Sequence, residues 1–133
     1  MNEKTAWKIF ARYIRLRDSL KTTRTSEFCR CCTCMRIKPF AEIEAGHFLS
    51  IRFKKIMFDE RNVHGQCHNC NSTDRYGKRG NPDAYHMFMI MTYGQRVVDE
   101  LEFKKKQFAQ FKSEDFKEIG EKYKLKIINI MDE

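Results

Sequence analysis

Residues able to bind metal ions gather in one part of the chain, residues 29–71, which is rich in cysteine, histidine and asparagine. Structural zinc is commonly held by two Cys-x-x-Cys turns, each of which contributes two thiolates to a tetrahedron. One such turn lies at residues 67–70, and two overlapping candidates lie at residues 29–32 and 31–34. One zinc ion can use only one of the overlapping pairs, so the other two cysteines are expected to be free thiols.

The six cysteines are expected to be metal ligands or thiols and not disulfides. No apolar run approaches the roughly 20 residues that span a bilayer, and the first residues lack the apolar centre of a signal peptide. Both features predict a cytoplasmic protein without a membrane partner. In such a reducing compartment disulfides are rare, and closely spaced cysteines are typical of metal sites.

The charge of the chain favours a polyanionic partner, most generally nucleic acid. The formal net charge is +8 over 133 residues, and the excess of Lys and Arg lies in residues 1–80, together with the cysteines. Lysine and arginine attract phosphates irrespective of base sequence. The candidate phosphate contacts lie between and just after the cysteine pairs, at Arg52, Lys54, Lys55, Arg75, Lys78 and Arg79.

The segments before and within the cysteine-rich stretch predict a helix and a small amount of strand. Apolar residues recur every three or four positions in residues 3–20, opposite a basic face, which predicts an amphipathic helix. Residues 43–49 favour a short strand, and a short helix should start near Cys70. Residues 51–58 fit either an irregular connection or a strand.

Helices are expected to make up the C-terminal part. Asn81 can cap a helix that has Pro82 in its first turn, and Gly94 is suited to end it after residue 93. A second helix is expected over residues 95–108. A third should run from Ser113, as its cap, to about Met131. The methionines of the first helix are expected to fill the core, at positions Met87, Met89 and Met91.

A histidine and two asparagines stand at a recognisable spacing around the cysteines. His47 lies in the expected strand, Asn62 lies five residues before Cys67, and Asn71 directly follows Cys70. This arrangement resembles that of the HNH, or ββα-metal, nucleases in a His-Asn-Asn variant.

The sequence is most similar in pattern to the NinG/Rap family of recombination nucleases of lambdoid phages. The resemblance covers roughly residues 5–103 and rests on ordered segments at residues 31–34, 44–48, 58–67, 70–71, 80–81 and 93–101. The Cys-x-Thr-Cys form of the family implies that the zinc ligands are Cys31, Cys34, Cys67 and Cys70.

This resemblance implies an α+β fold, with a small zinc-pinned ββα-metal core and flanking α-helices. The chain would be a single domain over residues 1–133, with the basic helix at 3–20, the core at 28–80 and the C-terminal helices at 82–131. The implied activity is that of a metal-dependent DNA endonuclease acting on branched recombination intermediates in the host cytoplasm. A homodimer formed through the C-terminal helices is a further hypothesis, since symmetric cleavage of a junction needs two active sites.

The resemblance also implies roles for the three residues of the pattern. His47 would be the general base that activates a water, since the pKa of histidine lies near neutral pH. Asn62 would help to fix a backbone contact that orients His47. The amide oxygen of Asn71 would help to hold one Mg²⁺ or Mn²⁺ ion, which prefers oxygen ligands.

Two positions depart from the pattern. Many ββα-metal enzymes carry an Asp or His directly before the base, but here that residue is Gly46, so Glu60 is the candidate for the missing ligand, followed by Glu44 or His64. The usual family glycine after the first cysteine turn is Met35. The lack of a metal-binding side chain at Gly46 also supports a second hypothesis, a zinc-dependent nucleic-acid-binding module that performs no chemistry.

Overall fold

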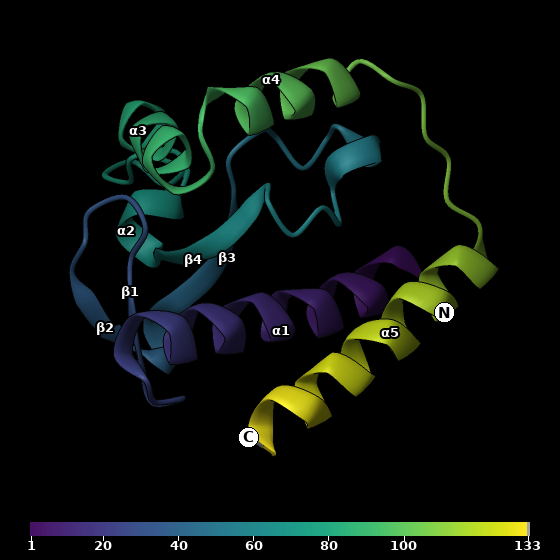
Figure 1. The fold of residues 1–133 in the computed structure, drawn as a ribbon, viewed down its shortest axis with the longest axis horizontal. Coiled ribbons are helices and arrows are strands. Elements are labelled where there is room, and N and C mark those ends of the chain that lie inside the picture. Colours follow the sequence, from purple (N-terminus) through teal and green to yellow (C-terminus); the bar gives the residue numbers. More distant parts are fainter. Residues whose placement is uncertain (133) are drawn as a thin grey trace.

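The computed structural model describes residues 1–132, which form five α-helices, four short strands and two 3-10 turns (Figure 1). In chain order these elements are α1 (Glu3–Thr23), β1 (Phe28–Arg30), β2 (Ile37–Pro39), η1 (Phe40–Glu42), β3 (Ile43–His47), η2 (Lys54–Ile56), β4 (Val63–Cys67), α2 (His68–Asn71), α3 (Pro82–Tyr93), α4 (Gln95–Lys104) and α5 (Ser113–Met131).

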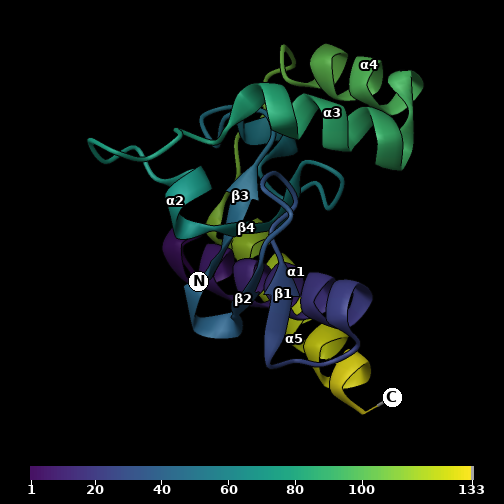
Figure 2. The ribbon, with the colours of Figure 1, turned by 90° about the vertical axis from the view of Figure 1, so that its left-hand side faces the viewer.

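The antiparallel hairpin of β3 and β4 lies between two pairs of helices, with α1 and α5 on one side and α3 and α4 on the other (Figures 1 and 2). Its register places Glu44 opposite Gln66 and Gly46 opposite His64. This mixed α+β architecture agrees with the expected class. Within residues 1–132, none of the helices combines the length and apolar character needed to cross a membrane.

Helix α1 and helix α5 run side by side and bury aromatic residues against the hairpin (Figure 1). Phe10 is fully buried and meets the ring of Tyr123 edge-on, with ring centroids 4.8 Å apart, and Val63 of β4 joins the same cluster. Helix α1 extends three residues beyond the expected end. There Thr22 and Thr23 donate to carbonyls one turn back, and Arg24, at φ 62°, forms the C-cap.

The predicted bounds of α3 and the position of its N-cap, Asn81, are confirmed, whereas the predicted cap of α5, Ser113, is wrong. Pro82 begins the helix and Gly94 follows its last residue at φ 88°, a conformation that glycine adopts without strain. Asn81 makes no capping bond and instead directs its Nδ2 at Cys70 Sγ, 3.7 Å away. At α5 the cap is Lys112, whose amide donates to Asp115 Oδ2 over 2.7 Å.

Only one of the three methionines assigned to the core lies there. Met89 is fully buried between α3 and α4, but Met87 and Met91 are 61% and 81% exposed. Residues two apart on a helix point about 200° apart, so these three could not share one buried face. Helix α4 also ends at Lys104, four residues before the expected Phe108.

Cys31 and Cys34 lie in the turn of a short hairpin that the sequence did not predict. Strands β1 and β2 have three residues each, and the turn between them is closed by a hydrogen bond from Cys31 N to Arg36 O of 2.8 Å. Met35 occupies this turn at φ 66°. A side chain is disfavoured in this left-handed conformation, which glycine adopts without strain.

Replacing Met35 with glycine should stabilise the protein. A non-glycine residue in the left-handed region costs roughly 1–2 kcal/mol, and the added freedom of glycine in the unfolded chain offsets about half of that gain. Met35 is 54% exposed, so little packing is lost. We expect a rise in melting temperature of about 2–4 °C, measured by circular dichroism. Met35→Ala is the control and should show no such rise.

Candidate metal centre and active site

Four cysteines from two turns form a compact cluster. Their sulfur atoms all lie within 4.8 Å of one another. The distance from Cys34 Sγ to Cys67 Sγ is 3.8 Å, close to the ~3.8 Å edge of a tetrahedron whose Zn–S bonds are about 2.3 Å. The cluster could therefore hold a structural metal such as zinc, and its members are Cys31, Cys34, Cys67 and Cys70.

The hydrogen bonds around Cys31 favour the form of the thiol that binds metal. Burial raises its pKa, but the backbone amides of Cys34 and Cys67 and the hydroxyl of Thr33 outweigh burial and lower it. The Thr33 oxygen lies 3.3 Å from the sulfur. Zinc binds thiolates, so these hydrogen bonds favour the metal-binding form of Cys31, whereas burial raises the pKa of Cys34 and of Cys67.

The other two cysteines lie outside the cluster. Cys29 is buried near Gly65, and Cys32 packs in the apolar cluster that contains Tyr85. Burial raises the pKa of both thiols. They therefore remain protonated at neutral pH, as expected for structural cysteines.

The hairpin β3–β4 and the short helix α2 form a ββα unit that carries the three residues of the His-Asn-Asn pattern. His47 ends β3, Asn62 directly precedes β4, and Asn71 ends α2. A cavity of about 500 Å³ is lined by His47, Asn71 and Arg79, among others. The fold thus brings the histidine and one asparagine to the same cavity, although 23 residues separate them in the chain.

His47 is held by one hydrogen bond and one stacking contact. Its Nε2 lies 3.1 Å from the carbonyl oxygen of Met57. A carbonyl only accepts, so Nε2 carries the proton and Nδ1 carries the lone pair. The ring of Trp7 stacks on the imidazole with centroids 4.8 Å apart. Burial lowers the pKa of His47 to about 4, so the ring is neutral at pH 7.

Asn62 fixes the loop that provides this carbonyl. Its Nδ2 donates to Leu49 O over 2.9 Å and to Ile56 O over 3.4 Å, while its Oδ1 accepts from Leu49 N over 2.8 Å. Asn62 itself is fully buried. The contacts agree with the expected role, because Ile56 is the neighbour of Met57 and both are held in place.

Asn71 is joined to a carboxylate and a second histidine. Its Nδ2 donates to Glu44 Oε1 over 2.8 Å, and Glu44 Oε2 lies 2.6 Å from His68 Nδ1. The hydrogen bond and charge of Glu44 raise the pKa of the exposed His68. With Nδ2 directed at Glu44, the amide oxygen of Asn71 is left for another partner.

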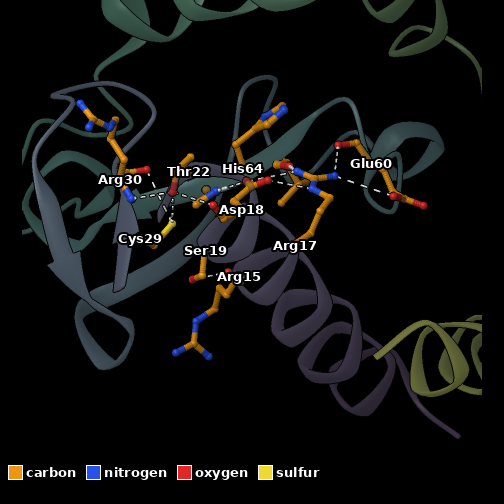
Figure 3. Close-up of polar contacts among 12 residues, drawn as sticks. Arg15, Arg17, Asp18, Ser19, Thr22, Cys29, Arg30, Glu60 and His64 are labelled. Carbon is orange, nitrogen blue, oxygen red and sulfur yellow. Dashed lines mark hydrogen bonds and ion pairs between the residues drawn. The ribbon is translucent and has the colours of Figure 1, made fainter. Parts of the chain in front are cut away.

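Glu60, the first candidate for the missing metal ligand, faces elsewhere. Its Oε2 accepts from Lys126 over 2.8 Å and from Tyr123 over 3.0 Å, both on α5, and Arg17 approaches its Oε1 at 3.8 Å (Figure 3). Burial raises the pKa of Glu60, but these donors outweigh it and lower the pKa. Glu60 therefore joins α5 to α1, and Glu44 is the carboxylate beside Asn71.

His64, another candidate, is enclosed by two tyrosines of α3. The hydroxyl of Tyr85 donates to Gly46 O over 2.6 Å, so it accepts from His64 Nδ1, 3.1 Å away, and Tyr93 lies 2.7 Å from Nε2. Burial lowers the pKa of His64 to about 3. This chain of hydrogen bonds holds the backbone next to His47. Neither tyrosine was expected to belong to the site, since the sequence placed both only in a helix.

The space beside Gly46 is filled from the neighbouring strand. A Cβ on Gly46 would collide with Oε1 of Gln66 and would lie 3.1 Å from Oδ1 of Asn71. Gln66 is fully buried, and its Oε1 has no hydrogen-bond partner within residues 1–132. Its Nε2 donates to Gly80 O over 2.8 Å and to Thr33 Oγ1 over 3.1 Å. Gln66 lies in the segment 58–67 that carries the family resemblance, but no role had been assigned to it.

The predicted phosphate-binding residues divide into three groups. Arg79 lines the cavity of His47, and Lys78 lines a larger cavity of about 870 Å³ beside the cysteine cluster. Lys54 is instead paired with Glu3 over 2.7 Å. The remaining three are exposed: Arg52 lies before η2, Lys55 lies in η2 and Arg75 lies in the loop after α2. Figure 2 shows that the loop after α2 extends away from the rest of the chain.

The fold and site define a small α+β protein organised around a tetracysteine centre and an adjoining ββα unit. A family model described as "Bacteriophage Lambda NinG protein" matches residues 2–133, so the chain belongs to the NinG family.

Three phage proteins called "Protein ninG" show the extent of the similarity. The protein of Salmonella phage P22 is 33% identical over 93 residues, which are 69% of this chain and 43% of that protein. The proteins of Escherichia phages 933W and lambda are 40% and 38% identical over 63 residues, 47% of this chain and 29% of each relative. The matched region thus spans less than half of the relatives' length. No solved structure matches.

Proposed function

We propose that this protein is a metal-dependent DNA endonuclease of the HNH type that acts on branched recombination intermediates in the host cytoplasm. The observation that carries the proposal is that His47 and Asn71 line the same cavity of a ββα unit. His47 offers a basic nitrogen, and Asn71 offers an amide oxygen that could bind a metal ion. Arg79 at the same cavity supplies positive charge for a phosphate.

His47 is prepared to act as the general base. Its Nε2–H is held by Met57 O, so Nδ1 is the basic nitrogen. Nδ1 would take a proton from a water as the water oxygen bonds to phosphorus, and the bond from phosphorus to the leaving oxygen breaks. Trp7 and the loop fixed by Asn62 hold the ring in place, which a general base requires.

Asn71, at the cavity of His47, and Glu44, which is hydrogen-bonded to Asn71, fit a hard divalent cation such as Mg²⁺ or Mn²⁺. Asn71 Oδ1 and the carboxylate of Glu44 are oxygen ligands of the kind that these ions prefer, and Glu44 takes the part that the sequence had suggested for Glu60. When bound, such an ion stabilises the charge that develops on the phosphate and on the leaving oxygen.

Cleavage assays with the zinc-loaded protein test this proposal. We expect Mg²⁺-dependent nicking of a four-way or replication-fork DNA, at least tenfold faster than nicking of the matching linear duplex, because the family resemblance points to branched substrates. Glu44→Gln should slow cleavage. The matched control is Glu42→Gln, an exposed acidic residue close in the chain.

The same assays decide between the nuclease and the non-catalytic alternative. DNA binding without metal-dependent nicking of any branched, linear or single-stranded substrate would support a zinc-dependent nucleic-acid-binding module and contradict the proposal. The homodimer stays a prediction as well. Sedimentation of the protein with and without a branched DNA would test it, and a monomer in both conditions would contradict it.

A further inference from the structure

We infer that Gln66 Oε1 is a direct ligand of the catalytic divalent cation and supplies, from β4, the ligand that position 46 of β3 lacks. This inference rests on the proposed function, since it names a further residue of the same site. Its basis is a buried acceptor without a donor, placed where a side chain of Gly46 would otherwise stand.

The orientation of the Gln66 amide is fixed by its partners. Gly80 O can only accept a hydrogen bond, so the atom 2.8 Å from it must be Nε2. The second contact of Nε2, to Thr33 Oγ1 at 3.1 Å, agrees. The carbonyl oxygen of the side chain therefore points the other way, toward Gly46 and Asn71.

In that position Oε1 lacks a hydrogen-bond donor. It is fully buried and has no partner within residues 1–132, a situation that costs roughly 1–3 kcal/mol unless something compensates. The neighbouring polar atom is another acceptor, Asn71 Oδ1, since Nδ2 of that residue is taken by Glu44. Two amide oxygens that lie close together, one of them buried without a donor, are typical of a site for a cation with oxygen ligands.

Gly46 is explained by the same arrangement. Its backbone lies outside the positive-φ conformations that favour glycine, so the backbone alone would accept any residue. What excludes a side chain is the collision of a Cβ with Gln66 Oε1. The two positions are therefore exclusive: either a side chain at residue 46 or the glutamine oxygen can occupy this space.

Carboxamide chemical shifts of the unmodified protein test the inference directly. The zinc-loaded, isotopically labelled protein is titrated with MgCl₂ while the side-chain carbonyl carbons are followed by NMR. We expect saturable shifts for Gln66 and Asn71 at one common affinity. Gln95, on the exposed face of α4, is the internal control and should not move. A shift of Asn71 without one of Gln66 would overturn the inference.

Exchanging the ligand between the two strands tests it a second time. Gln66→Ala should weaken Mn²⁺ binding by about tenfold or more, measured as free Mn²⁺ by electron paramagnetic resonance. The double variant Gly46→Asp with Gln66→Ala should recover part of the affinity, because the truncation removes the colliding Oε1. The Cβ of residue 66 and Oδ1 of Asn71, each 3.1 Å from the new Cβ, must then move by only a few tenths of an ångström. Gln95→Ala, which removes an exposed glutamine of α4, should bind Mn²⁺ as the wild type does.

The outcomes separate this inference from the proposed function. Metal-dependent cleavage by the wild type, together with unchanged Mn²⁺ affinity in a folded Gln66→Ala variant, would remove the inference alone. Absence of cleavage by the wild type, with Mn²⁺ still bound through Gln66, would remove the nuclease and leave the cation site. If neither Gln66 nor Asn71 responds to Mg²⁺, the cation site itself is contradicted.

Discussion

Loss of the metal from the tetracysteine centre should unfold the part of the protein that carries the candidate active site. Strands β1 and β2 have three residues each and α2 has four, and elements this short are not stable by themselves. Structural zinc contributes roughly 10–16 kcal/mol in small zinc domains, more than the stability of a typical domain. The bonds from the four cysteine sulfurs to zinc are therefore expected to hold the two cysteine turns together.

Cys70→Ser is the variant that should show this effect, because Cys70 is fully buried and belongs to the cluster. We expect it to lose bound zinc and to lower the melting temperature by more than 10 °C, or to prevent folding. Cys29→Ala is the matched control, since Cys29 is equally buried but lies outside the cluster. It should keep one zinc per chain and lose only about 1 kcal/mol of stability.

Zinc content and thermal unfolding of both variants measure the prediction. Zinc lost by Cys29→Ala as well as by Cys70→Ser would show that Cys29 and Cys32 bind the ion in place of Cys31 and Cys34. In the wild type, a strong chelator should reproduce the effect of Cys70→Ser. It should also disorder Asn71, which directly follows Cys70 and ends α2.

The elements best predicted from the sequence are those set by local chemistry. Pro82 and Gly94 bound α3 as expected, because a proline in the first turn and a glycine after the last act through the backbone of their own segment. The spacing of the cysteine turns likewise predicted the cluster. Geometry then selected Cys31 and Cys34 over the overlapping pair.

The direction of single side chains depended on contacts that no local pattern shows. Glu60 was the first candidate for the ligand missing at Gly46, yet its carboxylate is held by Lys126, 66 residues further on. Glu44 reaches Asn71 because β3 and α2 are neighbours in space. Gln66 could not be identified from the sequence, because its side chain reaches across the hairpin and fills the space where a side chain of residue 46 would lie.

Replacing His47 should abolish most of the catalytic activity while leaving DNA binding intact. A positioned general base contributes about 10²–10⁴ in rate, so His47→Ala is expected to slow Mg²⁺-dependent nicking by that factor. The matched control is His86→Ala, since His86 is exposed on α3 and has a stacking contact with Phe48 instead of the Met57 bond. Single-turnover cleavage and DNA affinity, measured separately, distinguish lost chemistry from lost binding.

The pH dependence of the cleavage rate also tests whether His47 is the base. Burial lowers the pKa of His47 to about 4, and a general base works in its neutral form, so the wild-type rate should show no fall near pH 6.5, where an exposed histidine would protonate. The lowered pKa also makes the stability of the folded protein depend on pH. His47 and His64 are protonated in the unfolded chain below about pH 6.5 but resist protonation when folded, so stability falls as the pH drops from there toward 4.

Cleavage should therefore stay constant from about pH 8 down to pH 6 and then be lost together with the folded structure. Circular dichroism at each pH shows whether the loss of rate follows unfolding. A rate that halves near pH 6.5 while the protein stays folded would mean that the base is not the buried His47. Equal cleavage by His47→Ala and the wild type would exclude His47 as the base at any pH.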